Sequence, residues 1–175
     1  HVVDALPYTK LNVLHWHLTD TQSFPVETPS RPSLWRGSFS KRERYSAEDV
    51  RRVVEHARLR GVRVVPEFDT PGHAESWCAG MPEVCPSASC RTPLDVSKQV
   101  TFDVLDDVLG DAAKLFSDGF VHLGGDEVDT SCDVSPRFPC EALMYSGLTL
   151  FSDSGSSYGY GYSLSRRTRL LSIDG

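Results

Sequence analysis

The chain has 175 residues, of which 39% are hydrophobic and 24% charged, and its formal net charge is −6. This is the composition of an ordinary globular protein, and the length allows one domain. No basic cluster is interleaved with aromatic residues, which argues against a nucleic-acid partner, and no apolar run approaches the roughly 20 residues of a membrane helix.

The first segments predict a helix end followed by a buried strand. Residues His1 to Tyr8 fit the end of a helix, so we expect the sequence to be a fragment whose targeting signal, if any, lies upstream. Residues 11–18 alternate like a strand, with Val13, His15 and His17 on one face and Leu14, Trp16 and Leu18 on the other. Both faces are largely apolar or aromatic, which predicts cover on both sides. Asp20 then opens a polar loop.

The clearest helix is predicted between Ser46 and Arg60. Ser46 is a suitable N-cap with Asp49 three residues later, and Gly61 stands where a helix C-terminal glycine belongs. An apolar stripe at helical spacing is formed by Val50, Val53, Val54 and Ala57. A second strand from Val62 to Phe68 leads directly into the loop DTPGH, residues 69–73.

The chain has five cysteines, all after this loop and three of them close together in loop-like sequence: Cys78, Cys85, Cys90, Cys132 and Cys140. No C-x-x-C pair is present, so disulfides in an oxidising compartment fit better than a zinc site. The odd count leaves at least one cysteine unpaired within the chain.

A second helix from Val100 to Phe116 precedes the most informative stretch, FVHLGGDEVD. A short apolar strand from Phe120 to Leu123 breaks at two glycines, and the adjacent carboxylates Asp126 and Glu127 follow. Two acids at a strand end suit acid–base chemistry, and they also suit metal binding.

Strands alternate with helices throughout, which predicts right-handed βαβ units and a parallel sheet. Polar residues follow each predicted strand: His17 and Asp20, then Asp69 and His73, then Asp126 and Glu127. Because the carboxyl ends of parallel strands build the active sites of α/β folds, we expect these residues to meet.

Four segments together resemble the family 20 glycoside hydrolases, the β-N-acetylhexosaminidases, and most of all their plant branch. The segments are NVLHWHLTDTQSFP, ARLRGVRVVPEFDTPGHAESW, PLDVS and HLGGDEVDTSC. The resemblance implies an α/β fold that is part of a (β/α)8 TIM barrel, with about three of the eight strands present in residues 1–132. Residues 133–175 read as a divergent, low-complexity tail that we expect to be disordered.

The resemblance also implies an activity, with no cofactor and no metal. The family removes terminal non-reducing N-acetylhexosamine residues from glycans or chitooligosaccharides, with retention, through an oxazolinium formed by the substrate's own acetamido group. By position, Glu127 matches the general acid and Asp126 the residue that orients the acetamide. Asp20 and His73 match further active-site positions, and Asp69 and His17 are expected to support them.

Further expectations follow from the same resemblance. Cys132 matches a half-cystine for which Cys90 is the expected partner, and Cys78 and Cys85 are expected to form a local pair. The parent protein is expected in the secretory pathway, in a vacuole or lysosome or outside the cell, and a dimer is possible for it. This chain alone is expected to be inactive and poorly soluble, because an open piece of barrel exposes apolar surface.

Two alternatives remain. One is a non-catalytic product that binds a glycan or a partner chain through the strand ends. The other is a metal-dependent barrel hydrolase, suggested by His15 and His17 on one strand face. We favour hydrogen-bonded core histidines for this pair and a structural role in the turn for His122.

Overall fold

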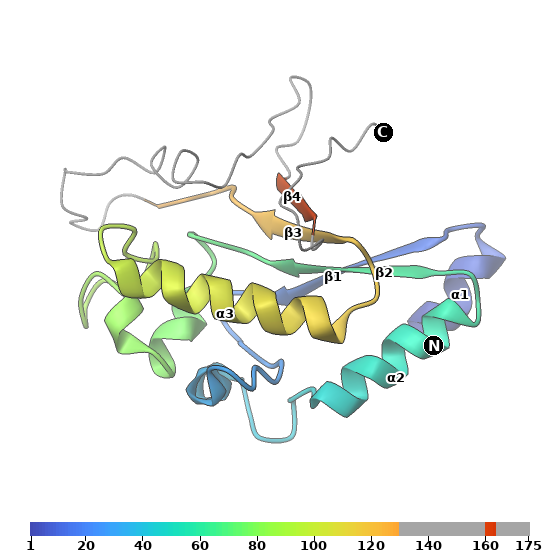
Figure 1. The fold of residues 1–175 in the computed structure, drawn as a ribbon, viewed down its shortest axis with the longest axis horizontal. Helices are drawn as coiled ribbons and strands as arrows, with labels where there is room; N and C mark the ends of the chain where they lie inside the picture. The colour runs from blue at the N-terminus through green and yellow to red at the C-terminus, as the bar shows by residue number, and fades with distance from the viewer. Residues whose placement is uncertain (130–159, 164–175) are drawn as a thin grey trace.

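Three parallel strands form the centre of the molecule. In the computed structural model, which describes residues 1–129 and 160–163, the strands are β1 (Val13–Thr19), β2 (Arg63–Phe68) and β3 (Phe120–Gly124). A short strand β4 (Tyr160–Ser163) runs antiparallel beside β3, so the sheet order is β1-β2-β3-β4 (Figure 1). The predicted parallel α/β sheet is therefore confirmed, and the sheet is open within the described residues.

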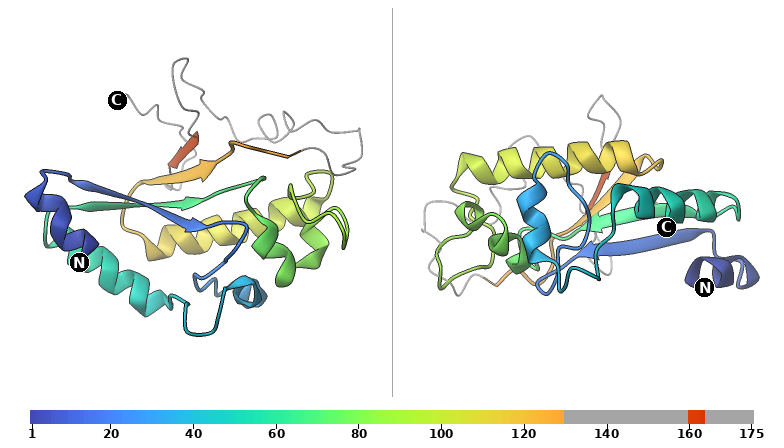
Figure 2. Two further views of the ribbon diagram at one scale, coloured as in Figure 1. Left: turned by 180° about the vertical axis from the view of Figure 1, so that it is seen from behind. Right: turned by 90° about the horizontal axis from the view of Figure 1, so that it is seen from below.

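Three α-helices lie on one side of this sheet, as Figures 1 and 2 show: α1 (Val2–Tyr8), α2 (Ala47–Arg58) and α3 (Gln99–Leu115). The connections also contain three 3-10 helices, η1 (Pro32–Gly37), η2 (Glu75–Ala79) and η3 (Pro82–Val84). The sequence did not predict these three, because elements of three to six residues are too short to show a helical period.

Helix α2 forms where its end signals and its apolar stripe agree. The Ser46 side chain accepts from the Asp49 backbone N–H while the Asp49 side chain accepts from the Ser46 N–H, which is a complete capping box. Val50 and Ala57 are fully buried against the sheet, and Gly61 takes a left-handed φ of 69° just past the helix. The predicted helix and both of its end signals are confirmed.

The core lies between the helices and the back of the sheet. Val104 and Val108 of α3 and Val121 of β3 are almost completely buried there. In the loop after β2, Cys78 and Cys85 form the expected local disulfide, with 5.9 Å between their Cα atoms. Cys90 is also disulfide-bonded, and its expected partner Cys132 lies outside the described residues, as does Cys140.

The two faces of β1 differ, which corrects the expectation of cover on both sides. Leu18 is 4% exposed toward the helices, whereas the side chains of His15 and His17 on the other face are 50% and 42% exposed. The alternation itself is as predicted, but α1, α2 and α3 all pack on the same side. Within the described residues the histidine face carries no covering helix (Figure 2).

Strand β4 lies in a stretch for which the sequence showed no strand period. It pairs with the outer edge of β3, with Val121 opposite Tyr162. Backbone hydrogen bonds to a free strand edge do not require alternating side chains, which explains why the sequence pattern did not predict β4. The rest of the tail predicted to be disordered lies outside the described residues.

Strand β3 ends where its glycines take conformations that other residues avoid. Gly124 and Gly125 have φ values of 67° and 104°. A Cβ atom on Gly124 would also overlap the carboxylate of Asp69, which packs against this turn. The predicted break of the strand at the two glycines is confirmed, and it directs the following acids away from the sheet.

Replacing Gly124 by Ala should therefore destabilise the protein by about 1–3 kcal/mol, through left-handed strain and the clash with Asp69. The matched control is Gly110→Ala in the exposed part of α3, where a Cβ meets nothing within 4 Å. That change should stabilise by about 0.5–1 kcal/mol. Urea unfolding of both variants measures the difference, and equal effects would contradict the assigned turn.

Candidate active site

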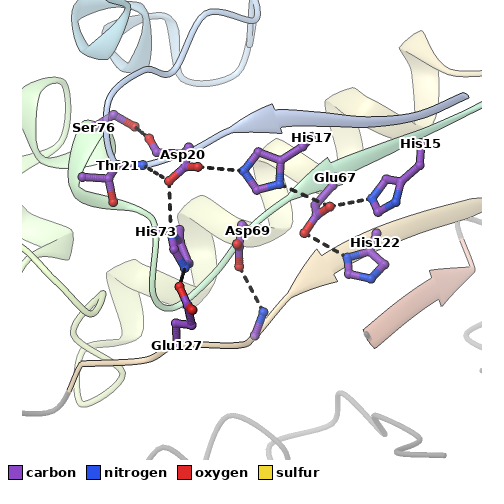
Figure 3. Close-up of polar contacts among 11 residues, drawn as sticks. His15, His17, Asp20, Thr21, Glu67, Asp69, His73, Ser76, His122 and Glu127 are labelled. Atoms are coloured by element: carbon purple, nitrogen blue, oxygen red, sulfur yellow. Dashed lines mark hydrogen bonds and ion pairs between the residues drawn. The ribbon is translucent and has the colours of Figure 1, made fainter. Parts of the chain in front are cut away.

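The polar residues after the three parallel strands lie together at one edge of the sheet (Figure 3). His73, from the loop after β2, lies between an acid that follows β1 and an acid that follows β3. Its Nδ1 is 3.1 Å from Oδ1 of Asp20, and its Nε2 is 3.5 Å from Oε2 of Glu127. The expectation that these strand ends meet thus holds for Asp20, His73 and Glu127.

His73 and Glu127 share an unusual backbone conformation. Their φ values are 48° and 49°, in the left-handed region that residues with a side chain seldom adopt. Such strain persists where surrounding contacts hold it, and it is concentrated at functional sites. The loop that carries His73 packs closely on the acid pair, because a Cβ on Gly72 would lie 3.3 Å from the Asp126 carbonyl oxygen.

Asp20 is the acceptor at the centre of the group. Its carboxylate accepts from the Thr21 backbone N–H at 2.6 Å and faces His17 Nε2 at 3.0 Å as well as His73. Burial alone would raise the pKa of Asp20, but these hydrogen bonds outweigh it and hold the pKa below its usual value. The contacts of Asp20 therefore favour its ionised form between two histidines.

Asp69 supports the turn before the acid pair. It is only 2% exposed, and its Oδ1 accepts from the Gly125 backbone N–H at 3.0 Å. Burial raises the pKa of Asp69, and the negative charges of Glu67 and Asp126 add to this effect. One oxygen each of Asp69 and Asp126 and one ring nitrogen of His73 lie within 4.8 Å of one another, so Asp126 joins the group too.

Histidine 73 responds to the acids around it. Burial lowers the pKa of His73, but the charge of Asp69 and the hydrogen bond and charge of Asp20 together outweigh burial. The pKa of His73 is therefore raised above 6.5. A single histidine is thus surrounded by Asp20, Asp69, Asp126 and Glu127. The arrangement can store a proton next to Glu127 and return it, which is what acid–base catalysis requires.

Glu67 is the residue that sequence reasoning missed. It is 6% exposed on the central strand, and its carboxylate faces His15 Nε2 at 2.5 Å, His122 Nδ1 at 3.1 Å and His17 Nδ1 at 3.3 Å. Burial raises its pKa, but the three histidines lower it to about 2. One signal was available: a glutamate within an apolar strand, beside a strand that carries histidines at alternate positions, needs buried partners.

The histidines around Glu67 also bear on the metal alternative. The described residues include three groups with ligand atoms within 4.8 Å of one another: His15, Glu67 and His122; His17, Glu67 and Asp69; Asp69, His73 and Asp126. In the first group, however, His122 Nδ1 already has two neighbours, the Gly124 backbone nitrogen at 3.0 Å and Oε1 of Glu67 at 3.1 Å. These contacts favour hydrogen-bonded histidines, and they tie His122 to the turn as expected.

The surroundings of the acid pair differ from the water-poor pocket expected of a general acid. The Glu127 side chain is 79% exposed, and Asp126 is exposed as well. The reason is geometric: both follow the last parallel strand on the face that no described helix covers. The described residues therefore position the acids but leave them in contact with water.

Comparison with known proteins gives a consistent result. The model of "Glycosyl hydrolase family 20, catalytic domain" matches residues 1–153, past the point where the motifs end. Beta-hexosaminidase 3 of Arabidopsis thaliana is 54% identical over 138 residues, covering 78% of this chain and 26% of that protein. Beta-hexosaminidase subunit beta of Mus musculus is 43% identical, covering 74% and 26%.

Solved structures agree. A family 20 exo-β-N-acetylglucosaminidase from Vibrio harveyi in complex with N-acetylglucosamine superposes with a TM-score of 0.69 at 28% identity, covering 82% of this chain and 27% of that one. The chain thus spans about a quarter of the length of the curated relatives it matches. None of the helices in the described part is long and apolar enough to cross a membrane.

The depressed pKa of Glu67 predicts a specific acid sensitivity. Because its pKa falls from 4.5 to about 2 on folding, its contribution to stability is complete above pH 4.5 and is lost as the pH drops toward 2. That contribution is about 3 kcal/mol. Glu67→Gln should lack this loss in urea unfolding at stepped pH, whereas Glu83→Gln, at an exposed glutamate, should keep it. Equal slopes in wild type and Glu67→Gln would refute the assignment.

Proposed function

Since this chain belongs to glycosyl hydrolase family 20, we propose that the protein hydrolyses terminal non-reducing N-acetylhexosamine residues of glycans or chitooligosaccharides. The observation that carries the proposal is the contact of His73 with both Asp20 and Glu127 at the strand ends. It supplies a carboxyl group with a histidine that can hold or return its proton. The relatives support the substrate class through their names.

In the proposed reaction Glu127 is the general acid. Its proton passes to the glycosidic oxygen as the bond between that oxygen and the anomeric carbon breaks. The acetamido oxygen of the substrate forms the new bond to the anomeric carbon, which gives the oxazolinium. Glu127, now ionised, then takes a proton from the water that attacks the anomeric carbon. The bond from that carbon to the acetamido oxygen breaks in this step, so the acetamide is restored and the sugar leaves with retained configuration.

Asp126 is proposed to accept a hydrogen bond from the acetamide N–H. An anion there orients the acetamido oxygen toward the anomeric carbon and stabilises the positive charge that develops on the ring being formed. Asp20 and His73 hold Glu127 in position, while Asp69 fixes the turn through Gly125 and His17 completes the contacts of Asp20. No step in this scheme uses a metal or a cofactor.

The setting of the protein is part of the proposal. The Cys78–Cys85 disulfide supports an oxidising compartment, the secretory pathway leading to a vacuole, a lysosome or the outside of the cell. The mouse relative is named as a subunit, and on that ground we propose that this protein also assembles, as a dimer. The non-catalytic alternative uses the same strand-end groups for binding alone.

The acid role of Glu127 predicts a dependence on the leaving group. Glu127→Gln in the full-length protein should lower kcat by about 10²–10⁴-fold with a methylumbelliferyl N-acetylglucosaminide, which needs protonation. The loss should be much smaller with a dinitrophenyl leaving group, which departs without a proton. Asp126→Asn should slow both substrates alike, and an equal loss for both substrates in Glu127→Gln would contradict the acid assignment.

The exposure of Glu127 predicts that the 175-residue chain alone does not hydrolyse p-nitrophenyl N-acetyl-β-glucosaminide. A carboxyl group that is 79% exposed lacks the dry surroundings in which a neighbouring charge acts strongly. The purified chain should show no release of p-nitrophenol from p-nitrophenyl N-acetyl-β-glucosaminide above a buffer control. Release that disappears in the Glu127→Gln chain would overturn this expectation, and release that persists in it would indicate a contaminating enzyme.

A further inference from the structure

Carboxylates and imidazoles alternate in an unbroken line from Glu127 into the interior of the sheet (Figure 3). The line runs from Glu127 through His73, Asp20 and His17 to Glu67, with contacts of 3.5, 3.1, 3.0 and 3.3 Å. Each contact joins one acid to one base. A change of charge at the buried end therefore alters the proton affinity of the next group, and of the one after it.

His17 is the link between the strand-end site and the buried Glu67. Its Nδ1 faces Oε2 of Glu67 and its Nε2 faces Oδ2 of Asp20. A ring that donates from both nitrogens to two carboxylates is an imidazolium. Burial lowers the pKa of His17, but the charge and hydrogen bond of Glu67 and those of Asp20 outweigh it and raise the pKa above 6.5.

We propose that Glu67 is a positioning residue for the hydrolysis: by holding His17 as a cation it balances the charge of Asp20, and it thereby disfavours a second cation at His73, beside Glu127. This inference rests on the proposed function. It assigns a task to a residue on β2 that does not touch the substrate-facing acids. Glu67 lies directly opposite His17 in the register of β1 and β2, so the contact is built into the sheet.

The direction of the effect follows from the charges. Without the Glu67 carboxylate, His17 becomes neutral at a lower pH, and Asp20 is left with His73 as its cationic partner. Asp20 then favours imidazolium at His73, and a cation there favours ionised Glu127, which has no proton to give. The groups that face Glu67 are His15 and His17 from β1, His122 from β3, and Asp69 just past the end of β2.

Asp69 acts in the same direction. The negative charge of Glu67 raises the pKa of Asp69, so removal of the Glu67 charge favours the ionised form of Asp69. An ionised Asp69 in turn favours the cationic form of His73. The remaining groups that face His73 are Asp20, Asp126 and Glu127. Glu67 contacts neither His73 nor these three acids. A change in the titration of His73 after removal of Glu67 has therefore been transmitted through the groups between them.

NMR titration of the histidine rings in the full-length protein tests this transmission without any measurement of activity. In Glu67→Gln the titration midpoint of His17 should fall by about one pH unit and that of His73 should rise. His15→Gln is the matched control, because His15 touches Glu67 but lies off the line to Asp20. His15→Gln should leave the titration midpoint of His73 near its wild-type value. If the cluster had only a structural role, His15→Gln and Glu67→Gln would disturb His73 alike.

A second variant protects the test against misfolding. His17→Gln keeps a polar side chain and removes the cation, so in the folded chain the His73 midpoint should rise as in Glu67→Gln. Folding of each variant is judged from its amide spectrum. An unchanged His73 midpoint in a folded Glu67→Gln or His17→Gln chain would overturn the inference.

Activity of the full-length protein separates this inference from the proposed function. In Glu67→Gln the alkaline limb of kcat/KM should move to lower pH with the methylumbelliferyl substrate and stay in place with the dinitrophenyl substrate. A wild type that turns over neither substrate rejects the proposed function, while the His73 midpoints still judge the coupling. An active wild type with an unmoved limb in Glu67→Gln rejects the inference and leaves the function standing.

Discussion

Two buried carboxylates, one on the central strand and one just past its end, constrain the rest of this structure. Glu67 lies on β2 and Asp69 follows directly after the strand, and one carboxylate oxygen of each lies within 4.8 Å of the other and of a ring nitrogen of His17. They are 6% and 2% exposed, and an unpaired charge buried to that extent costs several kcal/mol. Each therefore needs partners from neighbouring strands. Glu67 takes them from β1 and β3, and Asp69 takes the Gly125 N–H from the turn that follows β3.

These pairings fix the register and with it the site. His17 lies opposite Glu67 on one side, and His122 lies opposite it on the other. A slip of one residue would turn the histidines toward the helices and leave Glu67 buried without a partner. The same register sets where β1 and β3 end, and so where Asp20 and Glu127 meet His73. The geometry of the candidate site is thus a consequence of satisfying two carboxylates that lie behind it.

The sequence predicted what depends on local pattern. β1, β2, α2 and α3 were found because their periods and end signals are long enough to read, and Asp20, His73 and Glu127 come together because parallel strands share one edge. The 3-10 helices and β4 were missed, since short turns and edge pairing leave no period. Glu67 was missed for another reason: its partners lie in other strands, and His15 is 52 residues away. Only the assembled sheet shows what its charge does.

The two ends of the line differ in their exposure to water. Glu67, between two flanking strands, is already buried by their side chains, whereas Glu127 beyond the last parallel strand is 79% exposed. In a (β/α)8 barrel this polar face points inward, so closure removes water from the exposed end most of all. Charge interactions strengthen as water leaves. Three strands are therefore enough to raise the pKa of His17, while charge interactions at Glu127 strengthen only when the face above it is covered.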